Sequence, residues 1–418
     1  MIGAARAQAA RLGWPGGAPT ERVTGALVLL LVLGLATSIT VAQGTVLLLA
    51  AWLLARRRHG PPMPWPLLPA VLAFAAWTLV SALASDNPAG SLASARSLVW
   101  LGTPYVILAA LPDTASARRF LTALFVALTV VAGFAVVQVL ACPAGEPGTL
   151  VGPLAELFRK CGRARGFFSI YMTLAGVLML VLVAALPVVP RTSARRAGFL
   201  LAWLLGAAAL ALTFVRGAWL GFGAGVAAMA TGTAGVGGRR LAATLGMLLV
   251  GACTLLVLLP GVLDRALTIG DPRDETTRDR LAMLEAGIRM VEERPVLGVG
   301  TGQVRRFYPD YAPDYAARRS RSHLHNSPLQ VAVERGLPGL VLWLAIFGGF
   351  FVRAVRILIA VPASRPEARA LVLGPIAAVA AFLVAGFFED NFGDSEVWLV
   401  AAALMALPFI VERDLEAA

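Results

Sequence analysis

Residues 167–187 read FFSIYMTLAGVLMLVLVAALP, an unbroken stretch without a charged side chain. As an α-helix, a stretch of this length crosses a hydrocarbon core of roughly 30 Å while satisfying its own backbone hydrogen bonds. Comparable apolar stretches recur along all 418 residues, of which 58% are hydrophobic and 14% are charged. Since soluble domains carry roughly 25% charged residues, the composition predicts an all-α polytopic membrane protein.

About twelve stretches are long enough to span a membrane. The predicted spans are residues 22–39, 40–56, 67–85, 95–111, 120–140, 167–187, 199–215, 217–235, 241–261, 337–358, 370–388 and 396–411. The first two have an alternative interpretation as one long helix with a break near Ser38. Neither an internal repeat nor a soluble domain boundary is evident, so residues 1–418 are predicted to form a single integral membrane domain.

Arginines in the short connections predict the orientation, because positive charge is retained on the cytoplasmic side. They gather on one side of the predicted topology: Arg6, Arg11, Arg22, Arg56, Arg57, Arg58, Arg118, Arg119, Arg191, Arg195, Arg196, Arg239, Arg240, Arg353, Arg356, Arg365, Arg369 and Arg413. The opposite, periplasmic side receives residues 141–166, the tight turn around Arg216, and a large loop, residues 262–336, between the ninth and tenth spans. Topology therefore accounts for most of the net charge of +12, and no nucleic-acid partner is predicted.

The cysteines allow a test of this orientation. Cys142 and Cys161 both lie in the smaller periplasmic loop, residues 141–166, whereas Cys253 lies within a predicted span. A disulfide between the first two requires an oxidising compartment such as a periplasm. Two free thiols are the alternative.

The large loop, residues 262–336, is polar and Arg-rich and carries the run Ser322-His323-Leu324-His325-Asn326, with two of the three histidines. Apolar residues recur at helical spacing before Pro295, which predicts an amphipathic helix over 277–294. They are Leu281, Leu284, Ile288 and Val291. The following GVGTG run, residues 298–302, lacks the preceding strand and the terminal Lys-Ser/Thr of a phosphate loop, which favours a flexible turn.

Five arginines near the predicted outer membrane interface form a candidate anion site: Arg165, Arg216, Arg280, Arg305 and Arg306. Snorkelling of Arg216 to the interface, or plain solvation of the others, is the alternative. Guanidinium groups match phosphate oxygens in bidentate geometry and never deprotonate, so they can hold a lipid-linked diphosphate without a metal. A neutral histidine beside that diphosphate can take a proton from an acceptor hydroxyl. Together these groups favour a transfer reaction.

In these residues the chain resembles the superfamily of bacterial O-antigen ligases and O-antigen polymerases. The resemblance runs from Arg280, through the turn Arg294-Pro295-Val296-Leu297-Gly298-Val299-Gly300, to His325-Asn326 with Leu329, Glu334 and Gly336. The run Val215-Arg216-Gly217-Ala218 resembles the family's Ser-Arg-Gly-Ala segment, with valine where serine is usual. Leu284 stands where many members place tryptophan, four residues after the family's arginine. Because Arg278 lies only two residues from Arg280, both are candidates for that arginine.

The resemblance implies a GT-C-like glycosyltransferase of the bacterial inner membrane. Such an enzyme transfers O-antigen glycan from undecaprenyl pyrophosphate to a sugar hydroxyl of lipid A core at the periplasmic face. It implies that His325 is the catalytic base and that Arg216 and Arg280 bind the pyrophosphate. Arg165, Arg305 and Arg306 are added as binding residues on position and chemistry, and neither a metal nor another cofactor is expected.

Other functions remain open at this level. Within the same superfamily, the chain is alternatively an O-antigen polymerase or a protein O-oligosaccharyltransferase. A transporter is the alternative from another class, although transporters usually place ionisable residues at mid-span and these spans are nearly free of them. A zinc site built from His323 and His325 would need a further ligand, with Asp310 or Asp314 available.

Overall fold

The structure is a computed structural model that describes residues 19–56, 66–142, 161–189, 192–232, 246, 261–267, 271 and 274–417. Over these ranges the chain forms α-helices, short 3-10 helices and connecting turns, without a β-strand. The all-helical fold predicted from composition is therefore confirmed for the described ranges.

The elements follow in this order: α2 (Pro19–Thr37), α3 (Ile39–Arg56), α4 (Leu68–Leu83), α5 (Pro88–Ala95), the 3-10 helix η2 (Arg96–Gly102), α6 (Thr103–Ala110), α7 (Thr114–Leu140), α9 (Tyr171–Ala185), the 3-10 helix η4 (Leu186–Val188), α10 (Ser193–Leu212), α11 (Arg216–Gly232), α13 (Val262–Leu267), α14 (Glu275–Glu293), α15 (Val304–Tyr311), α16 (Ser327–Ala360), α17 (Pro366–Ala385) and α18 (Ser395–Glu416). Helices α2 and α3 form an antiparallel pair that reverses at Ser38, since Trp52 Nε1 donates to Thr24 Oγ1 at 2.9 Å. The alternative of one long first helix is therefore wrong.

Nine helical stretches among the described residues are long and apolar enough to cross a membrane. They are residues 20–37, 39–56, 88–110, 114–140, 171–188, 193–212, 327–360, 366–385 and 395–416. Two further predicted spans correspond to the shorter helices α4 and α11. The predicted span 241–261 lies outside the described residues except at 246 and 261. A multi-pass membrane protein is confirmed, whereas the number of twelve spans stays a prediction.

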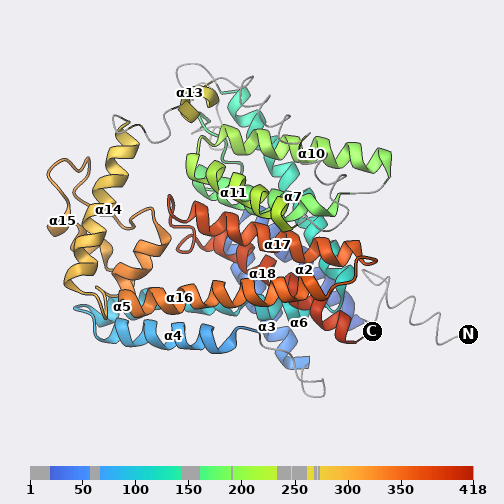
Figure 1. The fold of residues 1–418 in the computed structure, drawn as a ribbon, viewed down its shortest axis with the longest axis horizontal. Coiled ribbons are helices and arrows are strands. Elements are labelled where there is room, and N and C mark those ends of the chain that lie inside the picture. The colour runs from blue at the N-terminus through green and yellow to red at the C-terminus, as the bar shows by residue number, and fades with distance from the viewer. Residues whose placement is uncertain are drawn as a thin grey trace, which may run out of the picture.

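Helices α17 and α18 lie near the centre of the bundle (Figure 1), and α17 packs against α9, α11, α16 and α18. Every residue of α9 from Thr173 to Ala185 is buried. The contact between α11 and α17 is close, because a Cβ added at Gly221 would lie 2.6 Å from the Ala381 carbonyl oxygen. Small residues allow this approach between membrane helices, where packing replaces the hydrophobic effect.

Helices α14 and α15 lie at one end of the bundle, on the left of Figure 1; α14 packs against α16, and α15 packs against α14. They share a small apolar core, which consists of Met283, Ala286, Met290, Val299, Val304, Tyr308, Ala312, Leu324 and Val333. Helix α16 has a kink at Gly336, with φ 67°, where the predicted apolar span 337–358 begins. The segment from α14 to the first turns of α16 therefore caps one end of the bundle.

Helix α14 begins and ends within two residues of the predicted amphipathic helix, but its small and flexible residues face inward. The buried positions are Ala282, Met283, Ala286, Gly287 and Met290. The larger Leu281, Leu284 and Ile288 are 45%, 40% and 45% exposed. A Cβ added at Gly287 would lie 2.5 Å from the Leu329 side chain, so the glycine lets α14 approach α16 closely.

The GVGTG turn is firmly packed, so the expectation of a flexible turn was wrong. Gly298, Gly300 and Gly302 have φ values of 69°, 94° and 73°, a region that favours glycine. The Val299 amide donates to the Val333 carbonyl at 2.8 Å, and the Gly300 amide donates to the Glu334 carbonyl at 3.0 Å. These bonds tie the turn to the segment that precedes the kink in α16.

A disulfide joins Cys142, after the end of α7, to Cys161, with the two Cα atoms 5.4 Å apart. The alternative of two free thiols is therefore wrong. The segment after Cys161 lies against the end of α10, since the Ala164 amide donates to the Leu212 carbonyl at 2.9 Å. This places the segment that follows Cys161 near the start of α11, where Arg216 lies.

Candidate active site

His325 is held in an unusual backbone conformation at the start of α16. Its φ of 48° lies in the left-handed region, which non-glycine residues occupy only where the surrounding structure imposes it. The next residue, Asn326, caps α16 by accepting a hydrogen bond from the Leu329 amide at 2.9 Å. The Ser327 amide donates to the Gly386 carbonyl at 2.7 Å. The start of α16 is thus docked on the loop that follows α17.

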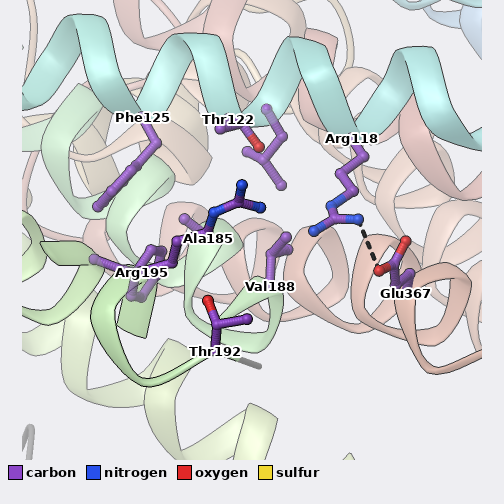
Figure 2. A pocket seen from close by; sticks show the side chains of 10 residues that line it. Arg118, Thr122, Phe125, Ala185, Val188, Thr192, Arg195 and Glu367 are labelled. Carbon is purple, nitrogen blue, oxygen red and sulfur yellow. Dashed lines mark ion pairs between the residues drawn. The ribbon is translucent and has the colours of Figure 1, made fainter. Parts of the chain in front are cut away.

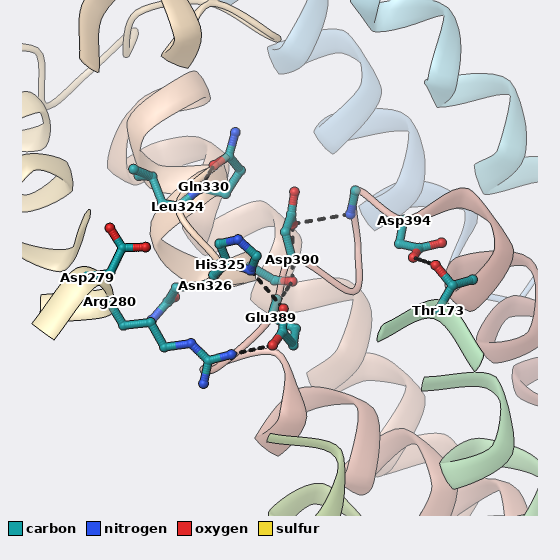
Figure 3. Close-up of polar contacts among 12 residues, drawn as sticks. Thr173, Asp279, Arg280, Leu324, His325, Asn326, Gln330, Glu389, Asp390 and Asp394 are labelled. Carbon is teal, nitrogen blue, oxygen red and sulfur yellow. Dashed lines mark hydrogen bonds and ion pairs between the residues drawn. The ribbon is translucent and has the colours of Figure 1, made fainter. Parts of the chain in front are cut away.

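That loop supplies a carboxylate to the histidine. Glu389 Oε2 lies 2.8 Å from His325 Nδ1, and Glu389 Oε1 forms an ion pair with the Arg280 guanidinium (Figure 3). Because a carboxylate paired with arginine only accepts hydrogen bonds, Nδ1 carries the ring proton and the lone pair lies on Nε2. In the neutral ring, Nε2 is then the nitrogen that can accept a proton.

A second ion-pair cluster surrounds Arg216, the first residue of α11, whose side chain is 7% exposed. Its Nη2 atom lies 2.9 Å from Asp274 Oδ1, and Arg265 Nη1 lies 3.1 Å from Asp274 Oδ2. Asp274 also caps α14 by accepting from the Thr277 amide at 3.0 Å. Burial by itself raises the pKa of Asp274, but the bonds from Arg216 and Thr277 and the charges of both arginines outweigh it and lower the pKa to about 2.

The ion-pair cluster around Glu389 and the one around Asp274 both contribute side chains to the wall of one cavity of about 230 Å³. Its polar lining consists of Arg216, Thr277, Arg280, His325 and Asn326. Its apolar lining consists of Leu220, Leu281, Leu284, Leu324, Phe387 and Phe388. The structure therefore brings together the predicted base and two of the predicted arginines, although they come from three separate helices or helix starts. We call this space the arginine cavity.

The other predicted binding residues do not line the arginine cavity. Arg305 and Arg306 are exposed on α15, and Arg306 stacks on Phe307 with its guanidinium carbon 5.9 Å from the ring centre. Arg165 lies in the segment between Cys161 and the start of α9. Of the two arginines that left the register open, Arg280 lines the cavity and Arg278 is exposed.

His323 lies beside His325, and the two rings meet edge to face with centroids 4.3 Å apart. Burial, followed by the proximity of His325, lowers the pKa of His323 to about 4. His323 is thus neutral at physiological pH. Among the described residues, no three His, Cys, Asp or Glu side chains are grouped as metal ligands.

A cavity of about 450 Å³ lies elsewhere, lined in part by Arg118, Arg195 and Glu367 (Figure 2). Arg118 and Glu367 form an ion pair at 2.7 Å, and both side chains are more than 40% exposed. Glu367 is in the first turn of α17, whereas Glu389 follows its last residue, which separates the two sites by roughly 30 Å at 1.5 Å per residue. No histidine is among the residues that line this cavity, so it lacks the base that the arginine cavity has to offer.

The sequence-based prediction missed the two carboxylates, Glu389 and Asp274. A usable signal existed for each. The run Glu389-Asp390-Asn391 separates the last two predicted spans on the predicted periplasmic side, where the site was expected. Asp274 lies three residues before the predicted amphipathic helix and is the N-cap of α14, a position that aspartate commonly occupies.

Residues 199–344 match a family model described as O-Antigen ligase. No curated protein matches the chain. The matched range begins in α10 and ends within α16, so it contains Arg216, Arg280 and His325 but not Glu389. This match, over about a third of the chain, supports the resemblance to the O-antigen ligase and polymerase superfamily. This family consists of glycosyltransferase-like membrane enzymes of lipopolysaccharide biosynthesis, which implies lipid-linked glycan and lipid A-type substrates in general.

Proposed function

We propose that the protein is an O-antigen ligase that transfers glycan from undecaprenyl pyrophosphate to a sugar hydroxyl of lipid A core. The observation that carries this proposal is the arginine cavity, where His325, oriented by Glu389, lies with Arg216 and Arg280. The family match over the same residues supports it. The leucine and phenylalanine side chains around the cavity suit a donor that carries a polyprenyl chain.

The reaction follows from the orientation of His325. Its Nε2 lone pair takes the proton of the acceptor hydroxyl while that oxygen bonds to C1 of the donor sugar. The bond between C1 and the pyrophosphate oxygen breaks, and its electron pair leaves with undecaprenyl pyrophosphate. Glu389 stabilises the imidazolium that forms, because its carboxylate accepts the Nδ1 hydrogen at 2.8 Å. The proton then passes from His325 to solvent.

The arginines stabilise the negative charge that develops on the leaving group. Arg216 and Arg280 both line the cavity, so their guanidinium groups supply positive charge at its wall. A guanidinium carries five N–H donors, and a single carboxylate does not exhaust them. Positively charged groups that are already in position stabilise the negative charge that develops in the transition state. The proposed mechanism therefore requires no metal.

The proposed location is the inner membrane, with the arginine cavity facing the periplasm. Two independent observations support this orientation. The short Arg-rich connections lie on the opposite side of the predicted topology. The disulfide between Cys142 and Cys161 lies on the same side as Arg216, and disulfides persist in oxidising compartments. In the proposed arrangement, residues 262–336 and 141–166 are the two periplasmic loops of one membrane domain.

The test is transfer by purified protein reconstituted with undecaprenyl-pyrophosphate-linked glycan and lipid A core, in the presence of EDTA. We expect glycan on the core with wild type and none with His325→Ala, while His59→Ala, which changes the third histidine of the sequence, remains active. Longer carrier-linked glycans would instead identify a polymerase. Activity of folded His325→Ala at the wild-type rate would refute the role of the base.

A further inference from the structure

A second cavity, of about 250 Å³, adjoins the histidine pair from another direction. His323 lines this cavity, whereas His325 lines the arginine cavity, and the two cavities share no lining residue. The two imidazole rings are in contact, with centroids 4.3 Å apart. The histidine pair therefore separates two spaces that differ in chemistry. We call the second space the hydroxyl cavity, because serine and threonine side chains contribute to its wall.

The charge in the hydroxyl cavity does not suit a pyrophosphate. Its single lining arginine, Arg335, is paired with Glu334 at 2.7 Å, so these two charges cancel. Asp390 adds a further carboxylate to the lining. Burial, followed by the charge of Glu334, raises the pKa of Asp390 to about 6, so this group can both accept and donate hydrogen bonds near neutral pH. The cavity therefore favours a neutral ligand rich in hydroxyl groups.

Two residues of the lining each have a buried polar atom without a protein partner. Within the described part of the chain, Thr301 Oγ1 and His323 Nδ1 are buried and have no hydrogen-bond partner, and Thr301 is 4% exposed. Buried polar groups without partners are rare, since each loses its hydrogen bonds to water on folding. A hydroxyl group of a ligand can both donate and accept, so it would satisfy either atom.

The wall of the cavity also includes a partly exposed aromatic ring. Trp100 lines it and is half-buried, and its carbonyl oxygen is held by the indole N–H of Trp398 at 3.2 Å. An indole combines a large apolar face with a polar edge, which suits a ring that has C–H groups on its faces and hydroxyl groups at its rim. The combination of this ring with Thr301, His323 and Asp390 matches a saccharide.

We propose that the hydroxyl cavity binds the sugar ring of the acceptor, an inference that rests on the proposed ligase function. In a displacement at C1, the attacking hydroxyl and the departing pyrophosphate lie on opposite sides of the donor sugar. The arginine cavity supplies the leaving-group side. The acceptor must then approach from the other side, where His323 lines the hydroxyl cavity and its ring centroid lies 4.3 Å from that of His325.

The experiment measures acceptor use and saccharide binding separately. Thr301→Val removes the unpartnered hydroxyl without removing a hydrogen bond within the described structure. Thr103→Val is the matched control, because Thr103 Oγ1 is also buried without a partner among the described residues but does not line the hydroxyl cavity. The probes are lipid A core as acceptor, undecaprenyl-pyrophosphate-linked glycan as donor, and deacylated core oligosaccharide for binding to the whole protein in detergent.

We expect Thr301→Val to raise the acceptor KM about tenfold and to weaken oligosaccharide binding similarly, the effect of losing one or two hydrogen bonds. The donor KM and kcat should stay within about twofold of wild type, and Thr103→Val should match wild type. A rise in the donor KM instead would assign the cavity to the glycan of the donor. Unchanged acceptor KM and unchanged oligosaccharide binding would overturn the inference.

Failure of the proposed function gives a different result. If wild type transfers no glycan, the ligase proposal fails, but the binding measurement still decides the cavity. Oligosaccharide binding that is weakened by Thr301→Val and not by Thr103→Val would support a saccharide site in the absence of transfer. Failure of wild type to bind the oligosaccharide would overturn it.

Discussion

Replacing Glu389 with glutamine should impair catalysis without impairing donor binding. The Glu389 side chain is 8% exposed and contacts both His325, at 2.8 Å, and Arg280. The neutral amide of glutamine can donate to Nδ1, which would move the ring proton to Nε2 and remove the base. It would also remove the negative charge that stabilises the imidazolium.

The expected magnitude follows from these two losses. A hydrogen bond to a charged group contributes about 1.5–3 kcal/mol, and the change of tautomer adds to that loss. We expect kcat to fall by about 100-fold to 1,000-fold, equivalent to about 3–4 kcal/mol in the barrier. The donor KM should not rise, because Arg280 loses a competitor for its guanidinium. The shorter carboxylate in Glu389→Asp should retain part of the activity.

The assay is steady-state transfer by the reconstituted enzyme, with donor and acceptor varied separately. Glu285→Gln is the matched control, because Glu285 is a carboxylate on α14 that is paired with the exposed Arg289. Folding is checked by size-exclusion chromatography and melting temperature, since Arg280 is 23% exposed and should tolerate the loss of its partner. Folded Glu389→Gln with wild-type kcat would refute the orienting role of this carboxylate.

Two further predictions concern charge. Arg216→Lys and Arg280→Lys should each lower kcat/KM about tenfold or more, because lysine keeps the charge but loses the bidentate fork; wild-type transfer by both would exclude a bidentate role. For His323, burial and then the proximity of His325 lower the folded-state pKa to about 4, below about 6.5 in an unfolded chain. The unfolded state therefore binds the proton first as the pH falls, so His323 costs stability progressively from about pH 6.5 to pH 4. The melting temperature of wild type should fall more over this window than that of His323→Gln, and parallel curves would contradict the pKa shift.

Part of the candidate site was predictable because its residues occur in a short pattern. Arg216 lies at the junction of two apolar stretches, and Arg280 and His325 lie in one polar loop. The structure places all three around the arginine cavity, while their catalytic roles stay a prediction. Arg165, Arg305 and Arg306 were predicted from their charge and their approximate depth relative to the membrane. Neither property specifies which way a side chain points, and none of the three lines that cavity.

The partners of these residues were not predictable in the same way. Glu389 meets His325 only because the loop after α17 docks on the start of α16, through the bond between Ser327 and Gly386. Packing also decided the inward face of α14, where Gly287 permits close approach to Leu329 and the leucines remain exposed. Side-chain size alone favours the opposite face.

The sequence by itself determined the all-helical membrane fold, because the transfer of an apolar stretch into a bilayer depends almost entirely on its own residues. It also determined that the polar groups gather in one large loop, residues 262–336. Only the tertiary structure decided which carboxylate orients His325, that Cys142 pairs with Cys161, and that two cavities adjoin the histidine pair. Those features depend on contacts between segments far apart in the chain, and local composition carries no information about which distant surfaces fit together.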